Sequence, residues 1–166
     1  MGMDVDIREL ASSELGELLR LYEHLHVSDD PLPPVSDVEA IWQSIHSNPA
    51  FKYFGVFVEE GLVASCTVSI IPNLTRRCRP YAVVENVVTH EGFRRRGLGT
   101  ALLKHALSFA WQAGCYKAML MTGRKDEGTF EFYEAAGFNS REKQAFIAKP
   151  RSAEQTAARD RAKHGA

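Results

Sequence analysis

Residues 83–106 read VVENVVTHEGFRRRGLGTALLKHA, and the rest of the chain is organised around this stretch. It begins with β-forming residues, passes through a basic turn that contains Gly97 and Gly99, and ends in a segment with helical periodicity. Backbone N–H groups at a helix N-terminus have no partner within the helix, and the helix dipole adds a partial positive charge there. Three arginines, residues 94–96, stand at this end, where cations are disfavoured by a few tenths to about 1 kcal/mol each. We therefore expect an anion-binding site at the turn.

The composition predicts one compact domain. With 166 residues and 45% hydrophobic content, the chain is long enough for one sizeable core and too short for two. We expect the domain to span residues 1–150, because residues 151–166 are polar, rich in alanine and free of aromatic side chains. The net charge of -1 gives no general attraction to nucleic acid or to an anionic membrane, so we expect neither as a partner.

The cysteines and the hydropathy indicate the compartment. Cys66, Cys78 and Cys115 are odd in number and lack the CxxC or Cys/His spacing of a metal site. They are typical of reduced thiols, and we expect no structural metal. No apolar run approaches the roughly 20 residues of a membrane span, and the N-terminus lacks the basic-then-apolar layout of a signal peptide. We expect a cytoplasmic protein.

Hydrophobic periodicity predicts an alternation of strands and helices. Strands are expected over residues 3–8, 51–59, 62–71, 81–89, 116–121 and 142–148. Helices are expected from Ser12 or Ser13, from Ser36 with a capping box to Glu39, over residues 98–113 and over residues 129–136. The helix between strands 81–89 and 116–121 makes them a right-handed βαβ unit with parallel strands.

Glycines and prolines mark the connections. The dipeptide Glu60-Gly61 predicts a hairpin turn, and Gly114 and Gly137 stand where helix-ending glycines are found. Residues 29–34 are proline-rich and form either the wall of a site or a plain connector. Residues 72–80 are basic and form a loop, which either meets an acidic substrate group or is simply solvated.

Glu85 interrupts the apolar strand over residues 81–89. A carboxylate inside such a strand costs desolvation energy unless it is paired or faces a cavity. The functional interpretation is a base or hydrogen-bond acceptor for a polar substrate, with a pKa raised by partial burial. The structural interpretation is a salt bridge to an arginine of the loop over residues 72–80. The position of Glu85, just before the glycine turn, favours the functional one.

Two motifs resemble the signatures of a known family. The pattern Arg94-x-x-Gly97-x-Gly99 after a strand resembles the Q/R-x-x-G-x-G/A signature of the GNAT superfamily of acyl-CoA-dependent N-acetyltransferases. The segment FYEAAGF, residues 132–138, resembles the second signature of that family. The two motifs together, with a helix and a strand between them, are far more specific than either alone. The close resemblance covers residues 83–138, and the order of elements matches across residues 5–148.

The resemblance implies a fold and a cofactor site. The fold is mixed α+β, with a central mixed, largely antiparallel sheet of about six to seven strands, splayed in the middle and flanked by about four helices. Acetyl-CoA, the co-substrate, is expected between the strand of Glu85 and the strand of Tyr116. The residues implied to bind it are Val87, Val88, Thr89, Arg94, Arg95, Arg96, Gly97, Leu98, Gly99, Thr100 and Asp126. The backbone of residues 87–89 is implied to pair with the pantetheine arm, and the turn to wrap the pyrophosphate.

The resemblance also implies a direct-transfer reaction in which an amine attacks the thioester through a tetrahedral intermediate. Such a reaction needs a neutral amine, an oxyanion donor and a proton for the departing thiolate. Tyr133 matches the proton donor, and the pKa of an unperturbed phenol, about 10, is close enough to that of a thiol for the exchange. Glu85 matches a position that holds the base or a water ligand in several members, and with Asn86 it is expected to contact the substrate.

One departure from the family pattern concerns the cofactor contact. Many members have asparagine and alanine where this chain has Asp126 and Thr129. An aspartate accepts hydrogen bonds but cannot donate through an amide, which puts the cofactor contact of Asp126 in doubt.

The acceptor amine is less well determined than the reaction. Residues 84–88 and the Cys-Tyr-Lys of residues 115–117 look similar to segments of glucosamine-6-phosphate N-acetyltransferases, although Asn86 replaces an acid there. A small-molecule amine is expected, with amino acids and protein N-termini as other acceptors. Since many relatives are dimers, a homodimer is one expected state.

Two other classes of function stay open at this point. A non-catalytic acyl-CoA-binding or regulatory domain would keep the turn and lose the acid, which Tyr133 argues against. A nucleotide-binding module would need a P-loop lysine, or a third glycine as in the Rossmann motif. The stretch after Gly97 contains neither.

Overall fold

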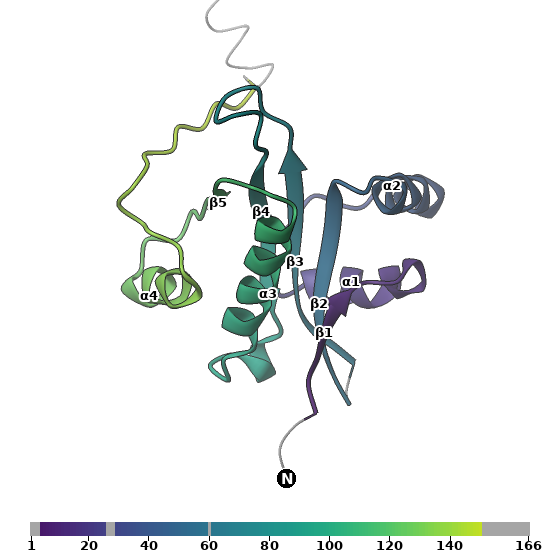
Figure 1. Cartoon of the computed structure of the whole chain (residues 1–166). Coiled ribbons are helices and arrows are strands. Elements are labelled where there is room, and N and C mark those ends of the chain that lie inside the picture. Colours follow the sequence, from purple (N-terminus) through teal and green to yellow (C-terminus); the bar gives the residue numbers. More distant parts are fainter. Residues whose placement is uncertain (1–3, 26–28, 60, 151–166) are drawn as a thin grey trace, which may run out of the picture.

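A computed structural model describes residues 4–25, 29–59 and 61–150 of the chain. Figure 1 shows one twisted sheet with helices on both sides. The strands are β1 (Asp6–Glu9), β2 (Phe51–Val58), β3 (Gly61–Ile71), β4 (Tyr81–Thr89) and β5 (Ala118–Leu120). The helices are η1 (Ser12–Glu14), α1 (Leu15–Tyr22), α2 (Val35–Ser47), η2 (Glu91–Phe93), α3 (Leu98–Gln112) and α4 (Glu127–Ala136), where η marks a 3₁₀ turn.

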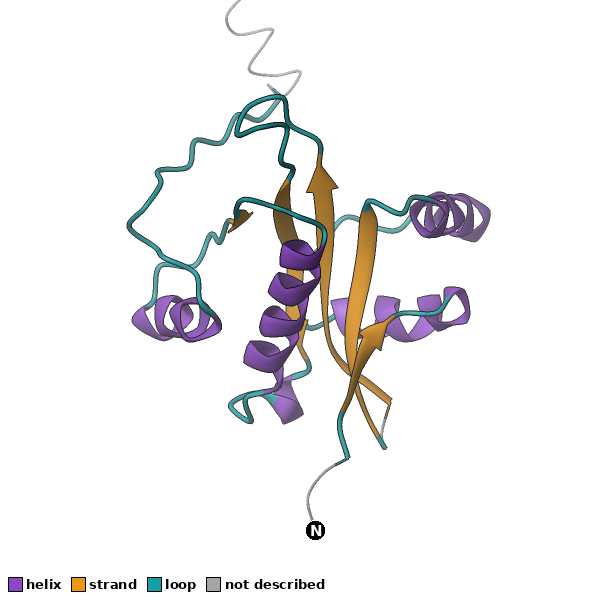
Figure 2. Ribbon diagram, viewed as in Figure 1, coloured by secondary structure: helices purple, strands orange, loops and turns teal. Residues whose placement is uncertain are grey.

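The sheet follows the order of the sequence, β1-β2-β3-β4-β5. Its first three pairings are antiparallel, and β4 pairs with β5 in parallel with α3 between them in sequence, which confirms the parallel pairing predicted for the βαβ unit. The orange strands of Figure 2 show this mixed sheet. The described residues form five strands rather than the predicted six to seven.

The strand predicted over residues 142–148 is wrong. This segment has no regular structure, and its two large apolar side chains, Phe146 and Ile147, are 91% and 68% exposed. The two are adjacent in sequence, so a strand would point them to opposite faces and neither face would gain an apolar stripe. Without such a stripe, nothing in the segment itself selects pairing with the sheet.

Helices cover both faces of the sheet (Figure 1). On one face α3 buries Leu102, Leu103 and Ala106 against β2, β3 and β4. On the other face α1 and α2 contribute Leu18 and Trp42 to a second cluster with Val88 and partly buried Tyr53. The middle of β3, residues 62–68, is therefore buried throughout, as a strand covered on both sides should be. The buried β3 thus holds its antiparallel neighbour β4 in place within the sheet.

The helix ends follow two of the predicted glycines. Gly114 and Gly137 have φ of 77° and 108°, the left-handed conformation that glycine adopts at little cost after a helix. The start of α2 was predicted less well, because the capping box of Ser36 is not formed and Pro34 occupies the N-cap position. A proline there fixes the backbone φ without needing a side-chain cap.

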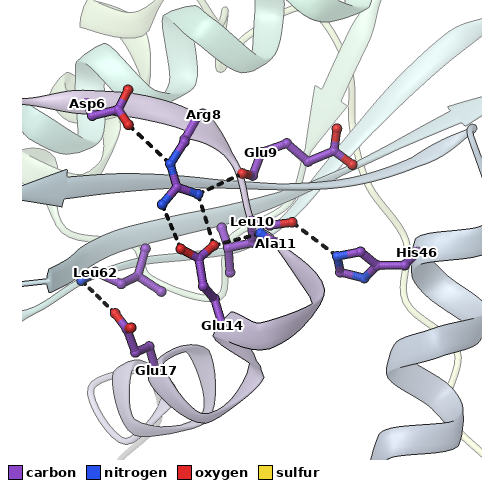
Figure 3. Close-up of polar contacts among 9 residues, drawn as sticks. All are labelled: Asp6, Arg8, Glu9, Leu10, Ala11, Glu14, Glu17, His46 and Leu62. Atoms are coloured by element: carbon purple, nitrogen blue, oxygen red, sulfur yellow. Dashed lines mark hydrogen bonds and ion pairs between the residues drawn. The ribbon is translucent and has the colours of Figure 1, made fainter.

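An ion-pair network replaces the serine cap that was predicted for the first helix. The Arg8 guanidinium donates to the Glu14 carboxylate over 2.9 and 2.6 Å, and the same carboxylate accepts from the Ala11 backbone N–H over 2.6 Å (Figure 3). These contacts hold the pKa of Glu14 below its ordinary value. Glu17 accepts from the Leu62 N–H over 3.2 Å, which ties α1 to the sheet.

Several predictions fall partly or wholly outside the described residues. They concern residue 3 of the first strand, Glu60 of the hairpin turn and the tail over residues 151–166. Within the parts of the chain that the structure describes, no helix is long and apolar enough to cross a membrane.

Candidate active site

The site begins where β4 and β5 part. The two strands pair only at Ala82–Ala118, Val83–Met119 and Val84–Leu120, whereas β4 continues to Thr89. Residues 85–89 therefore have no β5 partner. A cavity of about 1000 Å³ lies at this opening. It is lined by residues 84–89 of β4 and by residues 120–124, which form the end of β5 and the loop after it. The sheet is thus splayed between β4 and β5, as predicted, with β5 as the edge strand of the described sheet.

A bulge in β4 turns two polar side chains outward at the opening. The register between β3 and β4 shifts between Ser65 and Thr67, and Asn86 adopts a left-handed φ of 52°. The Thr67 hydroxyl donates to the Glu85 carbonyl oxygen over 3.1 Å and holds the irregular turn. Val84 on one side of the bulge is buried, while Glu85 and Asn86 are exposed and line the cavity.

Both sequence-based interpretations of Glu85 relied on burial or pairing, and the structure corrects them. The side chain is exposed, so the expected burial is wrong. No ion pair among the described residues includes Glu85, so the alternative salt bridge to residues 72–80 is wrong as well. The bulge explains both results because it takes Glu85 out of the strand interior. Glu85 faces the cavity instead.

The glycine turn forms one end of the cavity. After β4, the His90 imidazole accepts from the Gly92 N–H over 3.1 Å and caps the short turn η2. The chain then passes through Arg95 and Gly97, both with left-handed φ, into α3. No side chain caps α3, and its first residues, 98–100, line the cavity. The N-terminus of a 15-residue helix is therefore open to the cavity, which is the arrangement that an anion needs.

The two glycines of the turn serve different purposes. Gly97 supplies a φ of 78°, and the space around it is open. Gly99 has ordinary backbone angles, but a Cβ there would lie 3.0 Å from the Phe132 ring and 3.1 Å from the Thr89 hydroxyl. Gly99 therefore lets α3 begin in close contact with the end of β4 and with α4.

The three arginines of the turn have three different environments. Arg94 donates from Nε to the Thr89 carbonyl oxygen over 3.0 Å and from Nη2 to the His24 carbonyl oxygen over 3.3 Å. It ties the turn to β4 and to the segment after α1. Arg95 lines the cavity without such ties among the described residues. Arg96 is not among the lining residues, and its guanidinium lies over the Phe93 ring, 5.0 Å from the centroid.

Tyr133 and Glu85 line the same cavity, and Glu85 lies four residues before Thr89, where β4 ends and the turn begins. The tyrosine is half-buried on α4, and its ring packs against Phe132 and Phe138 at centroid distances of 4.8 and 6.4 Å. Burial raises the pKa of the Tyr133 hydroxyl above its ordinary value, the Arg124 guanidinium opposes that rise, and the Glu85 carboxylate adds to it. The phenol therefore keeps its proton at neutral pH, as a proton donor must.

Asp126 caps α4. Its carboxylate accepts from the Thr129 backbone N–H and from the Thr129 hydroxyl, each over 2.9 Å. These hydrogen bonds hold the pKa of Asp126 below its ordinary value. The two residues that depart from the family pattern therefore interact with each other, because Thr129 donates both hydrogen bonds to the Asp126 carboxylate. Asp126 lines the cavity, and its predicted contact with the cofactor stays a prediction.

Sequence reasoning placed the site in the correct region and missed some of its residues. All the predicted site residues except Arg96 line one cavity. The missed residues include His24 after α1 and Arg124 after β5. Arg124 could have been found, because β4 and β5 are parallel and the residues after their carboxyl ends meet at one edge. Within the described residues, no group of three or more His, Cys, Asp or Glu side chains could hold a metal ion.

Comparison with known proteins identifies the family. The sequence profile of the Acetyltransferase (GNAT) family matches residues 15–138. The chain belongs to the GNAT acetyltransferase family. It is 32% identical over 145 residues to a glucosamine 6-phosphate N-acetyltransferase of Trypanosoma brucei brucei. The aligned region covers 86% of this chain and 94% of that protein.

Solved structures agree with this assignment. One from Agrobacterium tumefaciens strain C58, whose name assigns it provisionally to the acetyltransferases, is 38% identical, with a TM-score of 0.80 over 87% of this chain and 99% of its own. An aminoglycoside N-acetyltransferase in complex with CoA is 20% identical, with a TM-score of 0.72 over 90% of this chain and 97% of its own, and shows the shared fold.

The GNAT assignment confirms the resemblance, the fold class and the reaction class. The chain is an N-acetyltransferase that transfers acetyl groups, and a non-catalytic binding domain is not favoured.

Proposed function

We propose that the protein transfers an acetyl group from acetyl-CoA to the primary amine of a small molecule in the splayed cavity between β4 and β5. One observation carries the proposal. A single cavity is lined both by an uncapped helix N-terminus, which follows the end of β4, and by the pair Glu85 and Tyr133. An anionic, thioester-bearing co-substrate and an amine need such a two-ended site.

The turn provides the anion end. The N–H groups of residues 98–100 and the nearby Arg95 are suited to a pyrophosphate, because a helix N-terminus and a guanidinium both favour negative charge. The unpaired second half of β4 provides backbone groups of residues 87–89 for the pantetheine arm, since this edge has no β5 partner. An N–H of this edge is also suited to the carbonyl oxygen, which becomes negative during attack.

Glu85 and Tyr133 provide the acid and base end. Glu85 accepts a proton from the amine, directly or through water, since its exposed carboxylate faces the cavity. Tyr133 donates its proton to the departing thiolate. Asn86, exposed by the same bulge, is placed to contact the acceptor.

The first acceptor to test is glucosamine 6-phosphate, because the relative at 32% identity carries that name and is matched over 94% of its length. The panel should add glucosamine, free amino acids, an aminoglycoside and a peptide with a free N-terminus. We expect release of free thiol from acetyl-CoA that depends on one class of amine, with one acetylated amine per thiol. Stabilisation by acetyl-CoA in a thermal shift assay, with no thiol release across the panel, would contradict the proposed transfer. ATP and NAD serve as cofactor controls.

Two further expectations stay predictions. The homodimer is checked by light scattering of the purified chain, and the cytoplasmic location by fractionation.

A further inference from the structure

Arg124 lines the cavity from the loop between β5 and α4, as do Glu85 and Tyr133 from their own elements. Its backbone N–H donates to the Thr122 hydroxyl over 3.2 Å, which turns the loop just after β5. No ion pair in the described part of the chain includes Arg124. The neighbouring carboxylate, Asp126, is hydrogen-bonded at the N-terminus of α4 instead. The guanidinium charge is therefore not neutralised by a partner there.

The Tyr133 hydroxyl has an unfavourable environment for its charged form. The side chain is half-buried, and the Glu85 carboxylate faces it from β4. The rings of Phe132 and Phe138 pack against it and offer no hydrogen bond, whereas the Thr122 side chain lowers the pKa of the phenol by hydrogen bonding. Arg124 is, among the described residues, the one charged group acting on this phenol that favours its ionised form.

We propose that Arg124 is a positioning residue for the acid step, which stabilises the phenolate of Tyr133 when its proton leaves. The proposal rests on the transfer reaction proposed above. In that reaction the amine nitrogen bonds to the acetyl carbon, the carbon–sulfur bond breaks, and its electron pair goes to sulfur. The Tyr133 O–H bond breaks and its proton joins sulfur. The amine's proton leaves to Glu85 or to water, and the phenolate later takes a proton from water.

The effect should appear in the chemical step rather than in binding. A general acid is most effective when its pKa approaches that of the group it protonates. Burial and the Glu85 carboxylate weaken the phenol as an acid, and the Arg124 cation offsets part of that effect. A close opposite charge shifts a pKa by about 1 to 3 units when well paired. Arg124 is exposed, so we expect a smaller shift, about 0.5 to 1 unit.

The first experiment measures the phenol itself and needs no acceptor amine. Tyrosinate absorbance is titrated for the wild type and for Arg124→Gln, Arg124→Lys and Lys125→Gln, each against the same protein with Tyr133→Phe. Lys125 is the matched control, because it lies next to Arg124 and does not line the cavity. We expect the Tyr133 midpoint to rise by about 0.5 to 1 pH unit in Arg124→Gln, less in Arg124→Lys, and not at all in the control. An unchanged midpoint in Arg124→Gln would overturn the proposal.

The second experiment measures the reaction. In Arg124→Gln we expect kcat to fall about three- to tenfold, the basic limb of the pH profile to move upward, and KM for acetyl-CoA to stay within about twofold. In the Tyr133→Phe background the same substitution should have no further effect on kcat. A rise in KM with kcat and the basic limb unchanged would make Arg124 a ligand contact and overturn the proposal. If the Tyr133 titration midpoint shifts in Arg124→Gln but the wild type acetylates no amine, the proposed function fails and the proposed interaction between Arg124 and Tyr133 stands.

Discussion

The cavity has two functional parts, an anion end at the glycine turn and a chemical end at Glu85 and Tyr133, and they use different parts of the chain. The anion end is made of backbone, namely the first N–H groups of α3, two left-handed turn residues and the close approach at Gly99. The chemical end is made of side chains that three separate elements bring together, Glu85 from β4, Arg124 from a loop and Tyr133 from α4. One short stretch of sequence forms the first end, whereas only the folded sheet forms the second.

This difference predicts how each end responds to mutation. A site made of backbone should tolerate most side-chain changes and fail where the backbone itself must change. A site made of side chains should lose activity when a single polar atom is removed, with little change in stability or cofactor binding. Substitutions at the two ends should therefore separate kcat from the KM for acetyl-CoA.

The largest effect is expected at the chemical end, for Tyr133→Phe. Removing one hydroxyl should lower kcat by about 10²-fold or more, because general acid catalysis typically contributes 10²- to 10⁴-fold. KM for acetyl-CoA should change by less than about twofold, since the ring and its packing remain. Steady-state kinetics across pH measure both, with Tyr116→Phe as a control that lies outside the cavity. A turnover number that is unchanged at every pH would show that Tyr133 is not the acid.

Next in size is Gly99→Val at the anion end. The new Cβ would press on the Phe132 ring and the Thr89 hydroxyl, so α3 must move away from the end of β4. We expect an overpacking cost of about 1 to 3 kcal/mol and weaker acetyl-CoA binding by about tenfold, which equals about 1.4 kcal/mol. Calorimetric titration and thermal unfolding measure these. Gly16→Val in α1 is the control, because a Cβ at Gly16 would make only an ordinary contact, 3.7 Å from the Arg20 guanidinium, and Gly16 does not line the cavity.

The sequence was informative wherever a local signal decides the structure. The helix predicted over residues 98–113, which the structure has at Leu98–Gln112, and the helix-ending glycines Gly114 and Gly137 were predictable, because capping and turn chemistry depend on a few neighbouring residues. The anion site followed from the same local signals. The GNAT signatures then supplied the fold.

The chemical end was harder to predict because it depends on contacts distant in sequence. Glu85 looks buried in a strand pattern, and only the shifted β3–β4 register, held by Thr67, shows that it faces outward. The strand predicted over residues 142–148 failed for a related reason, since a strand requires a partner that the sequence of the segment does not specify. Arg124 was missed because its place in the cavity follows from the parallel pairing of β4 and β5 and not from a local sequence pattern.

A smaller effect is expected for Glu85→Gln. The substitution keeps the shape of the side chain and removes its charge. If Glu85 is the base, kcat/KM for the amine should fall about tenfold and the acidic limb of the pH profile should disappear. Its exposure is the reason to expect less than the loss at Tyr133. Glu91→Gln is the control, because Glu91 is also an exposed carboxylate of the cavity but lies at the anion end. If KM for the amine rises and the acidic limb persists, Glu85 is a substrate ligand rather than the base.

The smallest effect should separate two adjacent arginines of the turn. Arg95 lines the cavity, whereas Arg96 lies over the Phe93 ring and does not. We expect Arg95→Gln to raise KM for acetyl-CoA about three- to fivefold and Arg96→Gln less than twofold, because one exposed charge contributes up to about 1 kcal/mol. The effect at Arg95 should shrink as salt is added, because the Debye length is about 10 Å at 0.1 M salt and exposed charges farther apart than this length are largely screened. The effect of Gly99→Val should be insensitive to salt, because it acts through the backbone. Equal effects at Arg95 and Arg96 would instead indicate that the turn attracts the cofactor by its overall charge, and the contrast between a backbone-built and a side-chain-built end would weaken.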